Sequence, residues 1–319
     1  MPELPEVQTT ASELHKLVRG LKIEDVWTDY GGDFHIGKKH IKDKKYFGYF
    51  RKNVIGAKIS SVSRRGKNVL INLGKRKIIA VHMKMTGHLL YGAYRRISNY
   101  KFLIPNEKKK ERRGKEMWEA EEEGPLRDSF NQFIHLVFSL SNKKHLVLSD
   151  MRKFARVTLV TKERVREELG NLGPEPLEKS FGFKPFLERL MLRPCAKIKQ
   201  ALLDQSLIAG IGNIYSDEML WLSSIHPLSP VIATPEDNLR ALYHSMKKIL
   251  NEGIDFRGDS TSDYRHPSGE KGQFQYRHQA YRQTGKKCPK PRCRGTIKRI
   301  VIGARSTHFC DRHQHCYNE

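Results

Sequence analysis

Four of the five cysteines of this 319-residue chain lie near its C-terminus, and they constrain the fold more than any other feature. Cys288 and Cys293 are followed by Cys310 and, shortly afterwards, by Cys316. Two ligand pairs on either side of a short segment allow one tetrahedral Zn²⁺ to stabilise a β-hairpin that is too small to fold alone. The clustering also argues against a disulfide framework spread through a secreted protein. We therefore predict one structural zinc in a C-terminal hairpin.

The fourth ligand of this zinc site is either Cys316 or His313. Five residues separate Cys310 from Cys316, whereas two separate it from His313. A site of four thiolates is the more common structural solution. The prediction therefore favours four cysteine ligands, Cys288, Cys293, Cys310 and Cys316, and leaves His313 as the open alternative.

Lysine and arginine outnumber aspartate and glutamate by 59 to 35, which gives a formal net charge of +24 at pH 7. Such a field concentrates the phosphate backbones of nucleic acids. No run of about 18 apolar residues could span a bilayer. The first residues also lack the basic and apolar regions of a secretion signal. We therefore expect a nucleic acid partner, no membrane partner, and a cytoplasmic location.

The hydrophobic pattern changes along the chain. Apolar residues recur at helical spacing from Leu4 to Val18, and Pro5 suits the first turn of that helix. Helical periodicity returns at residues 185–252. Between these regions the sequence has short β-like runs, at 69–73, 78–82, 134–138, 145–149 and 155–160.

This order predicts an α+β protein of several domains. We expect a sheet-rich domain at residues 1–168 and a linker at 169–182, where glycine and proline interrupt the periodicity. A helical domain at 183–270 and a segment at 271–319 with the zinc hairpin complete the chain. Residues 105–127 form a block of basic and then acidic residues, which we predict to be an exposed insertion, mobile or partly helical, that carries no catalytic signal.

Within the helical region, two helical stretches meet at a turn that contains Gly210 and Gly212, and Asn213 opens the second stretch. In one interpretation the glycines form the turn and Asn213 caps the helix. In the other, the free N–H groups at the helix N-terminus bind a DNA phosphate. The two interpretations are compatible.

Pro2 becomes the N-terminal residue once Met1 is removed, and it then carries a secondary amine. Such an amine can attack C1′ of a sugar and form a charged iminium directly. A terminal α-amino group has a pKa of about 8, and the positive end of the following helix lowers that value. Glu3 and Glu6 lie beside it in the sequence. They either transfer protons to the sugar or simply favour the helix N-terminus.

The opening MPELPEV resembles that of the bacterial formamidopyrimidine-DNA glycosylases, which share their fold with endonuclease VIII. The resemblance covers the chain except for the charged insertion. Its motifs follow in the family's order, RRGKNVL at 64–70, VHMKMTGHL at 81–89, SDMRKFARV at 149–157, LIAGIGNIYSDEMLW at 207–221, IHPLSP at 225–230 and ARSTHFC at 304–310. The family fold is an N-terminal β-sandwich with flanking helices, a helix-two-turn-helix domain and a β-hairpin zinc finger.

The resemblance implies a bifunctional enzyme of base excision repair that acts as a monomer on double-stranded DNA. Such an enzyme removes oxidised purines, chiefly 8-oxoguanine and formamidopyrimidines, and then cleaves the abasic strand by β,δ-elimination. By resemblance Pro2 is the nucleophile that forms a Schiff base. Glu3 is the acid that assists opening of the sugar ring, and Glu6 supports the site.

The matching motifs also imply which residues contact DNA. Three of them would bind phosphates near the lesion, namely Lys67, Asn213 and Arg305, and the resemblance counts Lys67 and Arg305 among the catalytic residues as well. Another three would fill the gap left by the everted nucleotide, namely Met85, Arg152 and Phe154. The same motifs add Glu6, His82 and Tyr215 to the expected DNA-binding residues.

The chain departs from the family pattern at a few positions. Lys84 stands where the family usually has glycine, and Lys153 where it usually has arginine. Both zinc-binding turns look longer than the usual two intervening residues. The region from Arg257 to Gln275 resembles the family's lesion-capping loop, but it does not reveal the preferred base.

Two alternative functions remain. An enzyme of the endonuclease VIII type would prefer oxidised pyrimidines, and Leu4 disfavours it because that type usually has glycine there. A non-catalytic protein that binds damaged DNA would use the same basic surface and zinc hairpin. Retention of Met1 would favour this second alternative.

Overall fold

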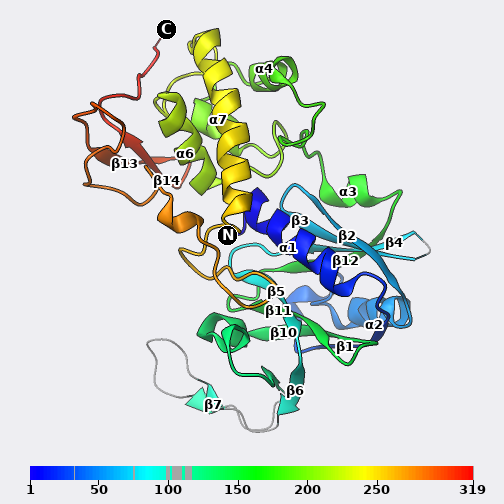
Figure 1. Ribbon diagram of the computed structural model, residues 1–319. Helices are drawn as coiled ribbons and strands as arrows, with labels where there is room; N and C mark the ends of the chain where they lie inside the picture. Colours follow the sequence, from blue (N-terminus) through cyan, green and yellow to red (C-terminus); the bar gives the residue numbers. More distant parts are fainter. Residues whose placement is uncertain (32, 75, 98–100, 103–109, 112–116, 319) are drawn as a thin grey trace. The chain divides into compact units, whose positions relative to one another are not determined.

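The computed structural model describes residues 1–31, 33–74, 76–97, 101–102, 110–111 and 117–318. The chain forms two compact units, and Figure 1 labels most of their helices and strands. Unit 1 comprises Met1–Pro2, Glu6–Glu168 and Asp259–Gly272, and unit 2 comprises Glu3–Pro5, Leu169–Gly258 and Gln273–Glu319. Among the described residues, no helix has the length and apolar character that a bilayer span requires.

Unit 1 is built on two four-stranded antiparallel sheets. The first has the order β1-β10-β11-β5, formed by Ile23–Thr28, Ile134–Leu140, His145–Asp150 and Gly87–Gly92. The second has the order β12-β4-β3-β2, formed by Arg156–Thr161, Lys77–His82, Asn68–Leu73 and Ile59–Arg65. Each of the five predicted β-like runs therefore corresponds to a strand.

Both sheets contribute to one apolar core, as a β-sandwich requires. Helix α1 (Leu4–Val18) places Val7 and Leu14 in this core, together with Leu136 of the first sheet and Ile79 of the second. This burial explains the helical spacing of the apolar residues near the N-terminus. The other helical segments of the N-terminal region are α2 (Lys44–Val54), α3 (Val165–Leu169) and the 3₁₀ turn η1 (Asp33–His35).

A further antiparallel pair, β6 (Tyr94–Ile97) with β9 (Met117–Ala120), packs on the first sheet. Trp118 is 7% exposed and contacts the small core that contains Val137. The prediction of an exposed insertion at 105–127 is therefore wrong for Met117–Ala120, where Trp118 and Ala120 are buried, whereas residues 121–125 are exposed as predicted. Most of its first half lies outside the described residues. The remaining elements here are β7 (Lys101–Phe102), β8 (Lys110–Glu111), η2 (Pro125–Arg127) and η3 (Ser129–Gln132).

Unit 2 is helical and carries the C-terminal hairpin. Its elements are α4 (Phe183–Met191), α5 (Ile198–Leu203), α6 (Asn213–Ser223), α7 (Glu236–Asp255), η4 (Phe274–Tyr276), β13 (Ile297–Ile302) and β14 (Arg305–Cys310). The hairpin closes through Gly303 and Ala304, with φ of 54° and 61°. Two successive positive φ values are typical of the tight turn that matches strand twist.

The segment Asp259–Gly272 belongs to unit 1, although the sequence assigned almost all of it to the helical domain 183–270. Its hydrogen bonds explain this correction, because Asp259 and Tyr264 bind Glu6, and Arg265 binds Asp128. The predicted linker at 169–182 lies in unit 2.

Candidate active site and nucleic-acid interface

Pro2 lies in unit 1, two positions before the first residue of helix α1, and is buried. Met1 precedes it in the full chain, so the Pro2 nitrogen is part of a peptide bond until Met1 is removed. Its predicted function as a nucleophile therefore has this removal as a condition.

Glu3 is held at the N-terminus of helix α6 within unit 2. It is 2% exposed, and its carboxylate accepts hydrogen bonds from the N–H groups of Ile214 at 3.1 Å and Tyr215 at 3.5 Å. The N-cap residue of α6 is Gly212, and a Cβ at this position would collide with the Glu3 carboxyl group. The residue that follows Pro2 is thus a buried acid at the positive end of a helix.

Three of the predicted DNA-binding residues belong to α6 and β14. Asn213 is the first residue of α6 rather than its cap, and its Nδ2 donates to the Ser306 carbonyl at 2.9 Å. Arg305 is exposed at the start of β14. Tyr215 is completely buried and stacks on Phe274, with ring centroids 4.9 Å apart. The Tyr215 side chain therefore belongs to the core, and the contact of this residue with DNA stays a prediction.

The sequence did not reveal a buried ion pair beside Asn213. The Lys199 ammonium contacts the Asp217 carboxylate, and neither side chain has exposed surface. Burial lowers the pKa of Lys199, although the charge of Asp217 opposes this shift. Asp217 also accepts a hydrogen bond from the N–H of His308 at 3.0 Å, so the pair connects α5, α6 and β14. The sequence offered one indication of this ion pair, a lysine within the largely apolar run IKQALL.

Glu6 lies in unit 1 and is 2% exposed. Its carboxylate accepts a hydrogen bond from the N–H of Asp259 at 2.7 Å, and its carbonyl accepts one from the Tyr264 hydroxyl at 3.1 Å. These contacts fit a supporting function. The contact of Glu6 with DNA stays a prediction.

Lys67 and His82 are close to each other across strands β3 and β4. Lys67 is 8% exposed and directly precedes Asn68, which is paired with His82. Burial, followed by the charges of Lys84 and Lys67, lowers the pKa of His82 to about 3. His82 is therefore neutral at physiological pH, and Lys67 supplies the positive charge at this place.

Met85 and Phe154 are exposed apolar side chains, with 37% and 48% of their surfaces accessible. The Arg152 guanidinium lies 4.5 Å from the centre of the Phe154 ring. Lys84 and Lys153, beside these residues, have φ of 56° and 55°. These values lie in the left-handed region that glycine adopts without strain, which accounts for glycine being usual at the position of Lys84.

Buried Asp150 connects the two loops that carry Met85 and Arg152. Its carboxylate accepts hydrogen bonds from the Thr86 hydroxyl and, at 2.7 Å, from the N–H of Ala155. The Thr86 oxygen in turn accepts the N–H of Arg152 at 3.1 Å. Within unit 1, one hydrogen-bond network thus holds Arg152 and the residues that follow Met85 and Phe154.

An Asp150→Asn variant is expected to lower the free energy of unfolding by about 1–3 kcal/mol, because an amide cannot accept at both positions. Urea denaturation measures this change. Asp25→Asn is the matched control, since Asp25 is exposed and paired with Arg51 at 2.6 Å on the surface. The control should change the free energy by less than about 1 kcal/mol. Equal effects of the two substitutions would contradict the account of Asp150.

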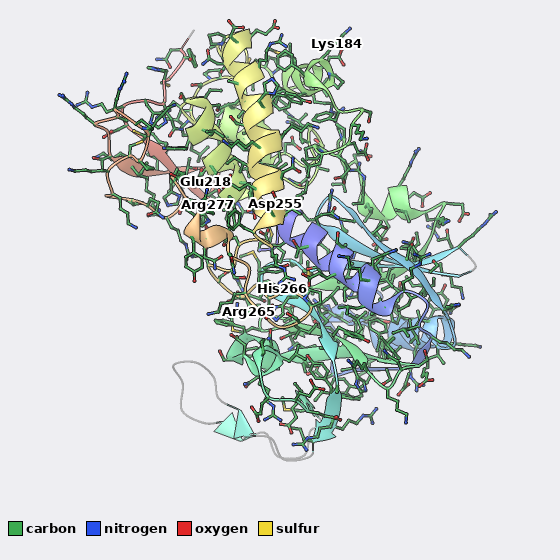
Figure 2. The ribbon with its side chains drawn as sticks, viewed as in Figure 1. Lys184, Glu218, Asp255, Arg265, His266 and Arg277 are labelled. Atoms are coloured by element: carbon green, nitrogen blue, oxygen red, sulfur yellow. The ribbon has the colours of Figure 1, made fainter. Side chains whose placement is uncertain are left out.

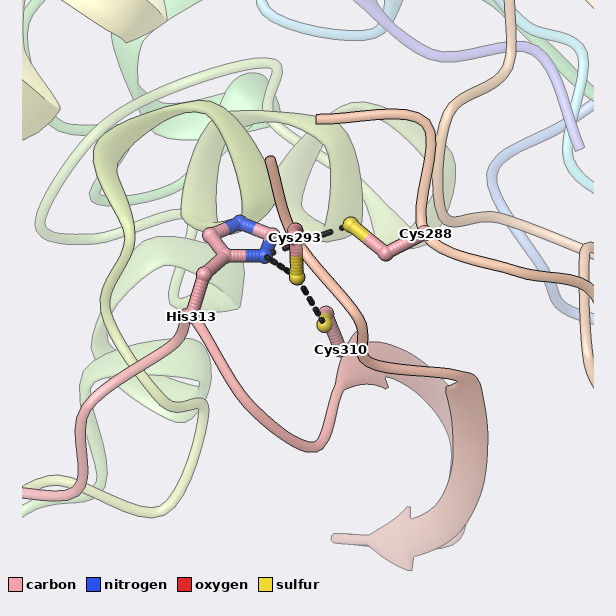
Figure 3. A group of neighbouring side chains, drawn as sticks. All are labelled: Cys288, Cys293, Cys310 and His313. Atoms are coloured by element: carbon pink, nitrogen blue, oxygen red, sulfur yellow. Dashed lines mark hydrogen bonds between the residues drawn. The ribbon is translucent and has the colours of Figure 1, made fainter. Parts of the chain in front are cut away.

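Three cysteines and one histidine converge in the C-terminal hairpin of unit 2, as Figure 3 shows. The ligand atoms of Cys288, Cys293, Cys310 and His313 all lie within 4.8 Å of one another. The Cys293 and Cys310 sulfur atoms are 3.6 Å apart, and His313 Nδ1 is 3.3 Å from the sulfur of Cys288. Thiolates bound to one tetrahedral zinc would be about 3.8 Å apart. The cluster therefore fits one structural zinc.

The preference for Cys316 as the fourth ligand is wrong. Cys316 is exposed, and its sulfur lies 3.4 Å from the Asn318 side-chain oxygen. The chain turns back at His313, and backbone hydrogen bonds then tie His315 to Ser224 and His226, beyond the C-terminus of α6. This pairing separates Cys316 from the cluster.

Helix α6 also orients the cluster. His313 Nε2 lies 3.0 Å from the Trp221 carbonyl, so its N–H donates there and Nδ1 faces the sulfur atoms. The Trp221 indole N–H donates to the Cys288 sulfur at 3.4 Å. Such outer contacts fix the tautomer and direction of metal ligands.

Known family models match three regions of the chain. The formamidopyrimidine-DNA glycosylase N-terminal domain matches residues 1–157, and the H2TH domain of the same enzymes matches residues 172–265. A zinc finger found in FPG and IleRS matches residues 285–312. The chain is therefore similar to these proteins in all three regions.

The same similarity extends to whole proteins. The formamidopyrimidine-DNA glycosylase of Herpetosiphon aurantiacus is 35% identical over 310 residues, covering 97% of this chain and 98% of the relative. A solved complex of Lactococcus lactis Fpg with DNA containing an abasic site is 30% identical, with a TM-score of 0.76 and coverage of 98% and 99%. A structure of MutM with DNA containing carbocyclic 8-oxo-G is also 30% identical, with a TM-score of 0.74 and coverage of 98% and 100%.

Proposed function

Because the chain belongs to the formamidopyrimidine-DNA glycosylase family, we propose that it excises oxidised purines from double-stranded DNA and then cleaves the abasic strand. The observation that carries this proposal is the fixed position of Glu3. The acid beside the proposed nucleophile Pro2 is buried and held by two N–H groups of α6, in the space that Gly212 leaves free.

In the proposed reaction, the Pro2 amine attacks C1′ of the damaged nucleotide after removal of Met1. The C1′–N bond breaks, and the base leaves with a proton. Glu3 provides the proton for opening of the sugar ring. The resulting iminium accepts electrons, so loss of a C2′ proton expels the 3′ phosphate, and a second elimination expels the 5′ phosphate. Hydrolysis of the iminium regenerates Pro2.

Positive and polar side chains would hold the DNA backbone. We assign phosphate contacts near the lesion to Lys67, Asn213 and Arg305, and Arg305 can form two parallel hydrogen bonds to one phosphate. Neutral His82 would accept or donate a hydrogen bond beside Lys67. We propose that Met85, Arg152 and Phe154 fill the gap left by the everted nucleotide. Apolar wedges and arginine replace the base stacking and base pairing that are lost there.

The zinc would be held by Cys288, Cys293, Cys310 and His313, and it would supply a crosslink that stabilises the hairpin carrying Arg305. We assign it no step of the reaction. The relatives come from bacteria such as Herpetosiphon aurantiacus, so we place this enzyme in the cytoplasm at the nucleoid, where its substrate lies.

A panel of duplexes with one lesion opposite each base tests the proposal. Under single-turnover conditions, 8-oxoguanine and formamidopyrimidine should be excised faster than oxidised pyrimidines, and each product should be a strand cut on both sides of the lost nucleoside. Faster excision of the pyrimidines would favour the endonuclease VIII type. Tight binding of abasic DNA without any cleavage would favour the non-catalytic alternative.

A further inference from the structure

A buried arginine fastens the segment Asp259–Gly272 within unit 1. Arg265 is 1% exposed, and its Nη2 donates to both carboxylate oxygens of Asp128 at 3.1 Å. Its Nη1 donates to the carbonyls of Ser262 and Tyr264 at 3.1 and 2.9 Å, so one guanidinium both closes the segment on itself and attaches it to Asp128. Figure 2 marks Arg265 and His266 in this segment.

Additional contacts surround the ion pair. Asn131 donates from Nδ2 to the carbonyl of Gly269 at 3.3 Å. Gly269 has φ of +87°, and a Cβ there would lie 2.6 Å from the carbonyl carbon of Pro125. The Arg265 guanidinium also lies 5.0 Å from the centre of the Phe130 ring. The end of the charged insertion and the residues after it therefore form a support for the segment.

The same segment contacts the helix that follows the proposed nucleophile. Asp259 donates its N–H to the Glu6 carboxylate, and the Tyr264 hydroxyl donates to the Glu6 carbonyl. His266 Nδ1 lies 3.2 Å from a carboxylate oxygen of Glu13. The segment thus lies between helix α1 and the support that contains Asp128. It contacts α1 at Glu6, which is four positions after Pro2.

We propose that Arg265 and Asp128 are positioning residues for base excision: their ion pair holds Asp259–Gly272 in the place from which it covers a damaged base. This inference rests on the proposed function and names the part of the chain that fixes the segment. Neither residue touches the reacting atoms. Removal of Asp128 would leave the buried Arg265 charge without its counterpart, and removal of Arg265 would break the hydrogen bonds that join the segment to Asp128, whose side chain is 25% exposed; either change loosens the segment.

The inference separates two activities of one enzyme. A damaged nucleotide presents a base for the segment to cover, whereas a preformed abasic site presents none. Misplacement of a positioning element by about 1 Å can lower a rate about 100-fold. Loss of the ion pair should therefore slow base excision and leave cleavage at an abasic site nearly unchanged. A general loss of folding would lower both activities together.

The test measures single-turnover excision of 8-oxoguanine and cleavage of a preformed abasic site in the same duplex. Arg265→Met and Asp128→Asn should each lower excision about 10–100-fold, with abasic-site cleavage within about threefold of the wild type. Arg265→Lys keeps the buried charge and loses the fork, so it should fall between wild type and Arg265→Met. The double variant should be no slower than the slower single variant, because the two residues act as one unit.

The matched control is Glu119→Gln, which breaks the pair of Glu119 with Arg95 between strands β6 and β9, where the Arg95 side chain is 59% exposed, in contrast to buried Arg265. It should leave both rates unchanged. Equal losses in both activities, no loss in either, or multiplicative losses in the double variant would overturn the inference. If the wild type itself fails to excise 8-oxoguanine or to cleave the abasic site, the proposed function fails instead.

Discussion

A Pro2→Gly variant is expected to excise 8-oxoguanine at least about 100-fold more slowly than the wild type. Glycine retains a terminal amine, but a primary amine forms a neutral imine that must gain a proton before it accepts electrons. The secondary amine of proline forms a charged iminium at once. Single-turnover kinetics measure the difference, with N-terminal sequencing to verify that Met1 is absent from both proteins.

Pro5→Ala is the control for this prediction, because it changes the other proline of the same N-terminal region and leaves the amine intact. Its rate should stay close to that of the wild type. Affinity for DNA with a stable abasic analogue should also be similar for Pro2→Gly and wild type. If Pro2→Gly excised 8-oxoguanine at the wild-type rate, Pro2 would not be the nucleophile.

A His313→Ala variant is expected to lose zinc and the fold of its C-terminal hairpin. Structural zinc in small fingers contributes about 10–16 kcal/mol of binding free energy, and the hairpin has little core of its own. Elemental analysis after dialysis against a chelator should give close to one zinc per wild-type chain and much less for the variant. DNA affinity should fall as well, since Arg305 lies in this hairpin.

Two further substitutions distinguish a residue that binds the zinc from one that only lies near it in the sequence. His313→Cys should retain zinc, because a fourth thiolate suits the same tetrahedral site. Cys316→Ser should retain zinc because Cys316 lies outside the cluster. Loss of zinc from Cys316→Ser together with its retention by His313→Ala would contradict the assignment.

The regular elements were predictable because local apolar periodicity determines them. The runs at 69–73 and 134–138 belong to β3 and β10, and the helical spacing from Leu4 to Val18 belongs to α1. Likewise, the cysteine spacing predicted the zinc site, because ligands that lie close in sequence leave few ways to enclose a metal. Both signals are local.

The errors and omissions involve contacts between distant parts of the chain. Arg265 and Asp128 are 137 positions apart, and no local pattern links them. The burial of Tyr215 against Phe274 was not predicted either, because a motif position does not reveal the packing of a side chain. The choice between His313 and Cys316 depended on the backbone pairing of His315 with the chain after α6.

Trapping with sodium borohydride tests the central claim most directly. Borohydride reduces an iminium to a stable amine, so the wild-type protein on 8-oxoguanine DNA should yield a covalent protein–DNA adduct. Digestion and mass spectrometry should then locate the sugar remnant on the nitrogen of Pro2. An adduct on any other residue, or no adduct from protein with a verified free Pro2 amine, would contradict the account.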